Sequence, residues 1–138
     1  MTRCLRVLLL LATSVVFTSC GASEPVGVWV IDVDRTLEKN PDMLPSDASA
    51  EDRQRVREFI GQMMTMTLES GGAATMEVEL FGTLRKDSAK WSLSGDQITI
   101  ESDDGDSKKV DSATIDGDSI VMVAKSQNGE QTLYLKRK

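Results

Sequence analysis

The stretch Trp91–Ile100, WSLSGDQITI, gives the clearest indication of how this chain of 138 residues folds. Its first half alternates apolar and polar residues up to a Gly95-Asp96 turn, and its second half alternates in the same way. Alternation on both sides of a glycine-containing turn is typical of an antiparallel hairpin that buries one of its faces. The stretch 113–122, ATIDGDSIVM, repeats this pattern around Gly117-Asp118, so we expect a second hairpin of the same kind.

The alternation continues over nearly all of the chain after residue 63. It is present in 64–68 (MTMTL) and in 74–80 (ATMEVEL). It is also present near the end of the chain, at Leu133 and Leu135. We count one strand at Gly27–Val33 and about seven strands after residue 63, with short turns between them. A sheet of about eight strands joined by hairpins buries its apolar face, and removes its exposed edges, by rolling up.

We therefore predict that residues 26–138 form an all-β domain. Its strands form an antiparallel up-and-down meander, closed or nearly closed into a barrel of about eight strands, with one helix after the first strand. Ser49 is a suitable N-cap for that helix, and its apolar residues fall at helical spacing: Val56, Phe59, Ile60 and Met63. This stripe predicts either a cover over part of the core or a lid over a ligand cavity. The preceding segment, 36–45, is predicted to be a turn-rich link because it contains two prolines.

The composition excludes several classes of function. The chain has no histidine and only two cysteines, which removes His-ligated zinc and every catalytic triad that uses histidine. Its 16 Lys and Arg against 22 Asp and Glu give a formal charge of −6, which argues against a nucleic-acid partner. We expect no cofactor.

Two groups of carboxylates could carry chemistry, and both have simpler explanations. Asp32 and Asp34 lie on the outer face of the predicted first strand or cap the turn that follows it. The acidic turns 103–106 (DDGD) and 116–118 (DGD) lack the EF-hand spacing, and Asp-Gly is common in tight turns. We therefore expect no metal site and no catalytic residue. A hydrolase that uses carboxylates alone is the weakest of the hypotheses.

The first twenty residues have the features of an export signal. Arg3 and Arg6 precede an apolar run, 7–17, that is too short to span a membrane. The segment 17–20, FTSC, resembles the lipobox of bacterial lipoproteins. This resemblance implies that residues 1–19 are a signal peptide, that Cys20 is lipidated, and that 20–25 is a tether to a membrane of the cell envelope.

The residue after the lipobox bears on the membrane that carries the anchor. Gly21 stands where an Asp would retain a lipoprotein of enteric bacteria at the inner membrane. The resemblance therefore implies the outer membrane, with the domain facing the periplasm or the cell surface. Ordinary secretion with cleavage nearby, and an uncleaved anchor, are the alternatives.

The remainder of the chain resembles a second family. Gly27-x-Trp29 resembles the G-x-W signature of lipocalins. The stretches 91–100, 117–120 and 133–136 resemble the small lipocalin-like domains that bacterial lipoproteins carry. The resemblance implies a barrel whose interior binds a small hydrophobic ligand.

The inward-facing positions are almost all apolar, and methionine adapts readily to the shape of a ligand. In a hollow barrel, we expect the ligand to contact Trp29, Met64, Met66, Met76, Trp91 and Met122. The alternative is a filled core in a non-enzymatic lipoprotein that binds a protein partner in the envelope or has a structural role there. The volume of the interior distinguishes these two hypotheses.

Overall fold

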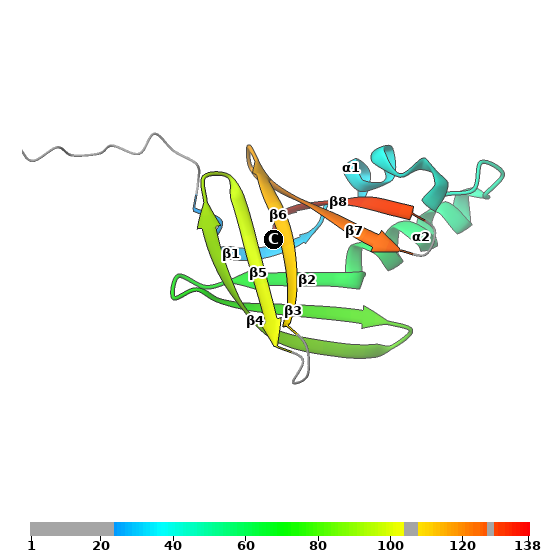
Figure 1. Cartoon of the computed structure of the whole chain (residues 1–138). Coiled ribbons are helices and arrows are strands. Elements are labelled where there is room, and N and C mark those ends of the chain that lie inside the picture. The colour runs from blue at the N-terminus through cyan, green and yellow to red at the C-terminus, as the bar shows by residue number, and fades with distance from the viewer. Residues whose placement is uncertain (1–23, 104–107, 127–128) are drawn as a thin grey trace, which may run out of the picture.

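Figure 1 shows the computed structural model of the chain, which describes residues 24–103, 108–126 and 129–138. Eight antiparallel strands follow one another around a closed barrel, in which β8 pairs with β1. The predicted fold class, a closed antiparallel barrel with a helix after the first strand, is confirmed. The elements are β1 (Gly27–Ile31), α1 (Val33–Lys39), a 3₁₀ turn (Pro41–Met43), α2 (Ala50–Met63), β2 (Met64–Leu68), β3 (Ala73–Leu80), β4 (Thr83–Ser94), β5 (Gln97–Asp103), β6 (Lys108–Asp116), β7 (Ser119–Ser126) and β8 (Gly129–Arg137).

The segment between the first strand and α2 differs from the prediction. The first strand ends at Ile31, and the predicted turn-rich link contains α1 and the 3₁₀ turn. The reason is Asp32, whose carboxylate accepts a hydrogen bond from the backbone N–H of Arg35 and so caps α1. The predicted cap of α2 is present, because Ser49 Oγ accepts from the backbone N–H of Asp52 at 3.1 Å.

Helix α1 lies along the part of β8 that β1 does not reach. The N–H of Asp32 donates to the carbonyl of Tyr134, and the N–H of Tyr134 donates to the hydroxyl of Thr36. The side-chain amide of Asn40 exchanges two hydrogen bonds with the backbone of Thr132, at 2.7 and 3.1 Å. The edge of β8 is therefore satisfied by a helix and its side chains instead of by a strand.

The barrel closes where β1 meets β8, at the register pairs from Trp29–Arg137 to Ile31–Leu135, which we call the seam. Trp29 is 2% exposed, and its indole N–H donates to the carbonyl of Pro25 at 2.7 Å. The Arg137 guanidinium lies over the Trp29 ring, 4.7 Å from its centroid. It also donates to the carbonyls of Val26 and Glu24, so one side chain joins the last strand to the first.

The same contact explains the glycine of the Gly27-x-Trp29 pattern. Gly27 has φ +143°, a conformation that other residues rarely adopt. A Cβ atom on Gly27 would lie 2.7 Å from Nη1 of Arg137. A side chain at this position would therefore displace the arginine that covers Trp29.

Part of the barrel interior is filled by one cluster of buried apolar side chains. The largest fully buried hydrophobic side chains of the barrel come from both sides of it and include Trp29, Ile31, Met66, Leu68, Ile98, Ile100, Ile120 and Leu135. Helix α2 contacts β1, β2 and β3. Its Ile60 is part of the buried core, and Val56 and Met63 pack against that core. Phe59 is the one residue of the predicted apolar stripe that remains exposed. Its ring lies beside Phe81 at the tip of the β3–β4 hairpin instead of in the core.

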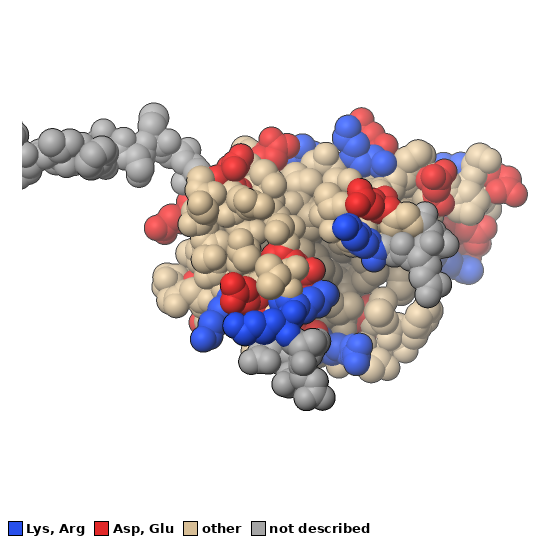
Figure 2. All heavy atoms as spheres, viewed as in Figure 1, with Lys and Arg blue, Asp and Glu red and all other residues tan. Residues whose placement is uncertain are grey.

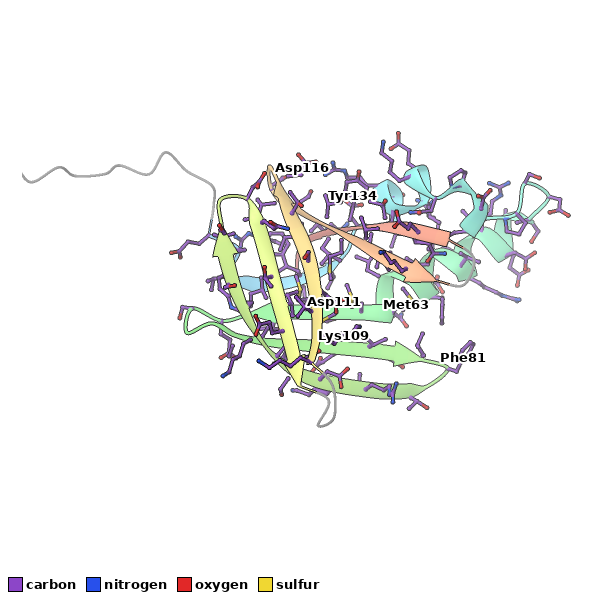
Figure 3. The ribbon with its side chains drawn as sticks, in the orientation of Figure 1. Met63, Phe81, Lys109, Asp111, Asp116 and Tyr134 are labelled. Carbon is purple, nitrogen blue, oxygen red and sulfur yellow. The ribbon has the colours of Figure 1, made fainter. Side chains whose placement is uncertain are left out.

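The tip of the β3–β4 hairpin is strained. Phe81 has φ 52° and Gly82 has φ 76°, and two positive φ values mark a type I′ turn, in which Asn-Gly is the preferred pair. Phe81 is also 93% exposed, so its ring buries little area in return. Figure 3 shows it projecting from the end of the hairpin.

Replacing Arg137 by Ala tests the seam. The change removes two hydrogen bonds and a cation–π contact, so we expect the free energy of unfolding to fall by about 2 kcal/mol. Urea denaturation followed by tryptophan fluorescence measures the loss. Lys136→Ala is the matched control on the solvent-exposed face of the same strand and should change stability by less than about 0.5 kcal/mol. Equal effects of the two variants would show that the seam does not depend on Arg137.

Replacing Phe81 by Asn tests the strain in the hairpin. Asn tolerates positive φ, so we expect the free energy of unfolding to rise by about 1 kcal/mol. Thermal and urea unfolding of both proteins give the difference. A lower stability of Phe81→Asn would mean instead that the contact with Phe59, with ring centroids 6.1 Å apart, outweighs the strain.

Candidate functional site

Strands β6 and β7 separate soon after the turn that joins them (Figure 1). Their register runs from Asp116–Ser119 to Ala113–Met122, and no pair beyond it occurs among the residues that the structure describes. We call the space between Lys108–Ser112 of β6 and Val123–Lys125 of β7 the β6–β7 gap. Each of these segments remains paired on its other side, to β5 and to β8 respectively.

A cavity of about 880 Å³ opens at the β6–β7 gap and extends into the barrel. Its volume lies in the range of small-molecule sites, roughly 300–1,000 Å³. Figure 2 shows a hollow in this face of the molecule. The cavity is lined by Met64, Met76, Lys109, Val110, Asp111, Ser112, Thr114, Val121, Met122, Val123, Ala124, Lys125, Glu130 and Leu133.

The interior part of this lining is apolar and its rim is polar. Met64, Met122 and Leu133 belong to the buried core, and Met76 and Ala124 pack against it. At the rim, Lys109 and Asp111 form an ion pair of 3.2 Å (Figure 3). They occupy alternate positions of β6 in phase with Ala113, which is buried, so both lie on the inward face of the strand.

Of the six residues that we predicted to contact a ligand, three line the cavity and three do not. Met64, Met76 and Met122 line the cavity. Trp29 and Met66 are fully buried in the core and do not line the cavity. Trp91 packs at the margin of the core, and its indole N–H donates to the carbonyl of Glu69. The interior is therefore filled around Trp29 and Met66 and hollow where it opens at the β6–β7 gap.

The polar rim was absent from the sequence prediction, although the sequence contains a signal for it. The alternation puts Ala113 and Ile115 on the same apolar face, and carried backwards it puts Asp111 and Lys109 on that face too. Two charged residues at inward positions of a strand indicate an opening rather than a packed core.

Three of the other carboxylates named in the sequence have structural partners. Asp32 caps α1, and Asp34 forms an ion pair with Arg57 of α2. Asp116 of the second acidic turn lies 3.6 Å from Arg35. Residues 104–106 of the first acidic turn lie outside the described residues. So do the predicted signal peptide, the predicted lipidation site Cys20 and the start of the tether.

The described residues contain no group of three or more Cys, Asp or Glu side chains that could hold a metal ion. Every buried side-chain nitrogen or oxygen in this part of the chain has a hydrogen-bond partner. None of the described helices has the length and apolar character needed to span a bilayer. The cavity at the β6–β7 gap is thus the main candidate for function.

These features define a class: a closed eight-stranded antiparallel barrel with a hollow half, an architecture that can enclose one small ligand. A sequence model of the lipocalin-like domain family matches residues 26–122. The chain therefore belongs to the lipocalin-like domain family. No curated protein matches the chain.

Proposed function

We propose that this domain is a non-enzymatic binding protein for a small hydrophobic molecule, which occupies the cavity at the β6–β7 gap. The observation that carries the proposal is the cavity of about 880 Å³ with an apolar interior. Three of its inward-facing residues, Met64, Met76 and Met122, are methionines, whose flexible thioethers adjust to ligands of different shape. We expect affinity for a range of apolar ligands rather than one.

The polar rim limits how such a ligand lies. Lys109 and Asp111 are charged and partly exposed, so contact with them does not stabilise the binding of an apolar group. The apolar part of a ligand therefore enters beyond them, toward Met122 and Leu133. A polar end, where the ligand has one, stays at the rim.

We also propose that the domain is a lipid-anchored protein of the cell envelope, held at the outer membrane through Cys20. The lipobox-like FTSC at 17–20 supports this anchoring. Arg137 holds the backbone of Glu24 and Val26 at the filled half of the barrel. In an anchored protein, the filled half would lie nearest the membrane and the cavity farther from it.

Filling the cavity tests the ligand-binding proposal. Ala124→Phe places a ring in the space that Ala124 lines, so we expect the dissociation constant for N-phenyl-1-naphthylamine to rise at least about tenfold. Fluorescence titration measures it. Ser92→Phe, on the exposed outer face of β4, is the matched control and should bind the probe like the parent protein. Absence of saturable binding to the parent protein, or unchanged binding to Ala124→Phe, would contradict the proposal.

Replacing Cys20 by Ala tests the anchor. The variant lacks the thiol that receives the lipid, so we expect the protein to move from the membrane fraction to the soluble fraction. Cell fractionation and immunoblotting measure the distribution. Cys4→Ala is the control, because Cys4 lies in the predicted signal peptide, and should stay with the membrane. A membrane-bound, full-length Cys20→Ala protein would show that the N-terminal segment acts in another way.

A further inference from the structure

The lysines on the outer face of the β6–β7 gap stand opposite acidic residues. Lys108 alternates with the inward positions of β6, and its register partner on β5 is Asp103. Lys125 alternates with the inward positions of β7, and its register partner on β8 is Glu130. These matched residues give a ligand no unopposed charge to bind on the outer face.

One charged pair of the cavity lining faces the interior instead. Of the described residues that line the cavity, Lys109 and Asp111 are the charged ones at inward positions, and their side chains form an ion pair of 3.2 Å. A ligand whose apolar part lies against the methionines of the cavity has to pass this pair. The pair is therefore the group that reads the polar end of the ligand.

The two charges of this pair lie at different depths. Along the inward face of β6, Ala113 is 2% exposed, the side chain of Asp111 is 34% exposed, and that of Lys109 is 64% exposed. The register partner of Asp111 is the buried Ile100. From the interior outward, this wall of the cavity is thus first apolar, then anionic and then cationic (Figure 3).

This order of charges selects among polar groups. A ligand with a single charge, of either sign, is attracted by one member of the pair and repelled by the other. A dipolar group is attracted by both members when its own charges run in the opposite order, and is repelled by both when they run in the same order. Arg85 and Asp87, at inward positions of β4, do not line the cavity.

We propose that the ligand is a dipolar amphiphile in which a cationic group adjoins the apolar part and an anionic group lies at the far end. The cationic group lies beside Asp111, and the anionic group lies beside Lys109. The apolar part lies against Met122 and Leu133. The inference rests on the proposed function, because it names the class of ligand for the same cavity. Alkyl betaines have this order of charges, whereas fatty acids have a single charge.

The test compares two amphiphiles that differ in the order of their charges. Decyl sulfobetaine has its ammonium group next to the chain and its sulfonate at the end, and decylphosphocholine has its phosphate next to the chain and its ammonium group at the end. Both have the same chain and no net charge. Displacement of N-phenyl-1-naphthylamine from the parent protein, below the critical micelle concentrations, gives the two dissociation constants. We expect decyl sulfobetaine to bind at least about fivefold more tightly.

Reversing the ion pair should reverse this preference. Lys109→Asp with Asp111→Lys retains both charges and the net charge of the protein, so we expect decylphosphocholine to bind more tightly to this double variant. The matched control is Glu77→Lys with Lys86→Glu. It reverses an ion pair of 3.1 Å between β3 and β4, whose side chains have nearly the same exposure, 37% and 62%, but lie on the outer face. The control should retain the preference of the parent protein.

A neutral variant keeps the test decisive if the reversed pair does not fold, which circular dichroism shows. Lys109→Gln with Asp111→Asn removes both charges and nearly preserves the side-chain sizes, so the two amphiphiles should bind it with equal affinity. Equal affinities for the parent protein, tighter binding of decylphosphocholine to it, or an unchanged preference in the neutral variant would overturn the inference. In these outcomes the naphthylamine probe still binds, so the proposed function stands. Failure of the probe to bind the parent protein would defeat both.

Discussion

The structure depends on the pairing of its first strand with its last. A sheet with one apolar face has an inside only when it closes, and here the closure rests on three register pairs between β1 and β8. The contact is short because β1 has only five residues. Arg137 reinforces it by covering Trp29 and by holding the backbone just before β1. Helix α1 then completes the edge of β8 that the short β1 cannot reach.

The two halves of the interior differ because the strands diverge on one side only. In the filled part, large buried side chains such as Trp29 and Ile100 belong to one close-packed core. Toward the β6–β7 gap, the wall opens, and the inward positions carry Ala124, methionines and the Lys109–Asp111 pair. The divergence that opens the cavity also leaves part of β6 and part of β7 without a strand partner on that side.

The alternation of apolar and polar residues was enough to predict the barrel, because the inward-facing apolar side chains of all the strands pack into the same core. Ser49 likewise marked the start of α2, because its side chain caps a backbone N–H whatever surrounds it. Helix α1 was missed because Val-Ile-Asp-Val also alternates, and its partners, Thr132 and Tyr134, are distant in sequence. The position of the cavity was equally hidden: Met66 and Met76 look alike in the sequence, and only the divergence of β6 from β7 decides that Met76 borders open space.

The distance along the chain between β8 and the N-terminal elements that it contacts has a consequence for biosynthesis. Thr36 and Tyr134, which bond across α1 and β8, are 98 residues apart. Any machinery that makes or threads this chain from its N-terminus therefore handles an unclosed sheet until β8 emerges, with the edge of β1 exposed throughout. Ring closure is then the last event and an intrinsically slow one, since it joins the most distant strands. The nascent protein is most vulnerable to mispairing in that interval.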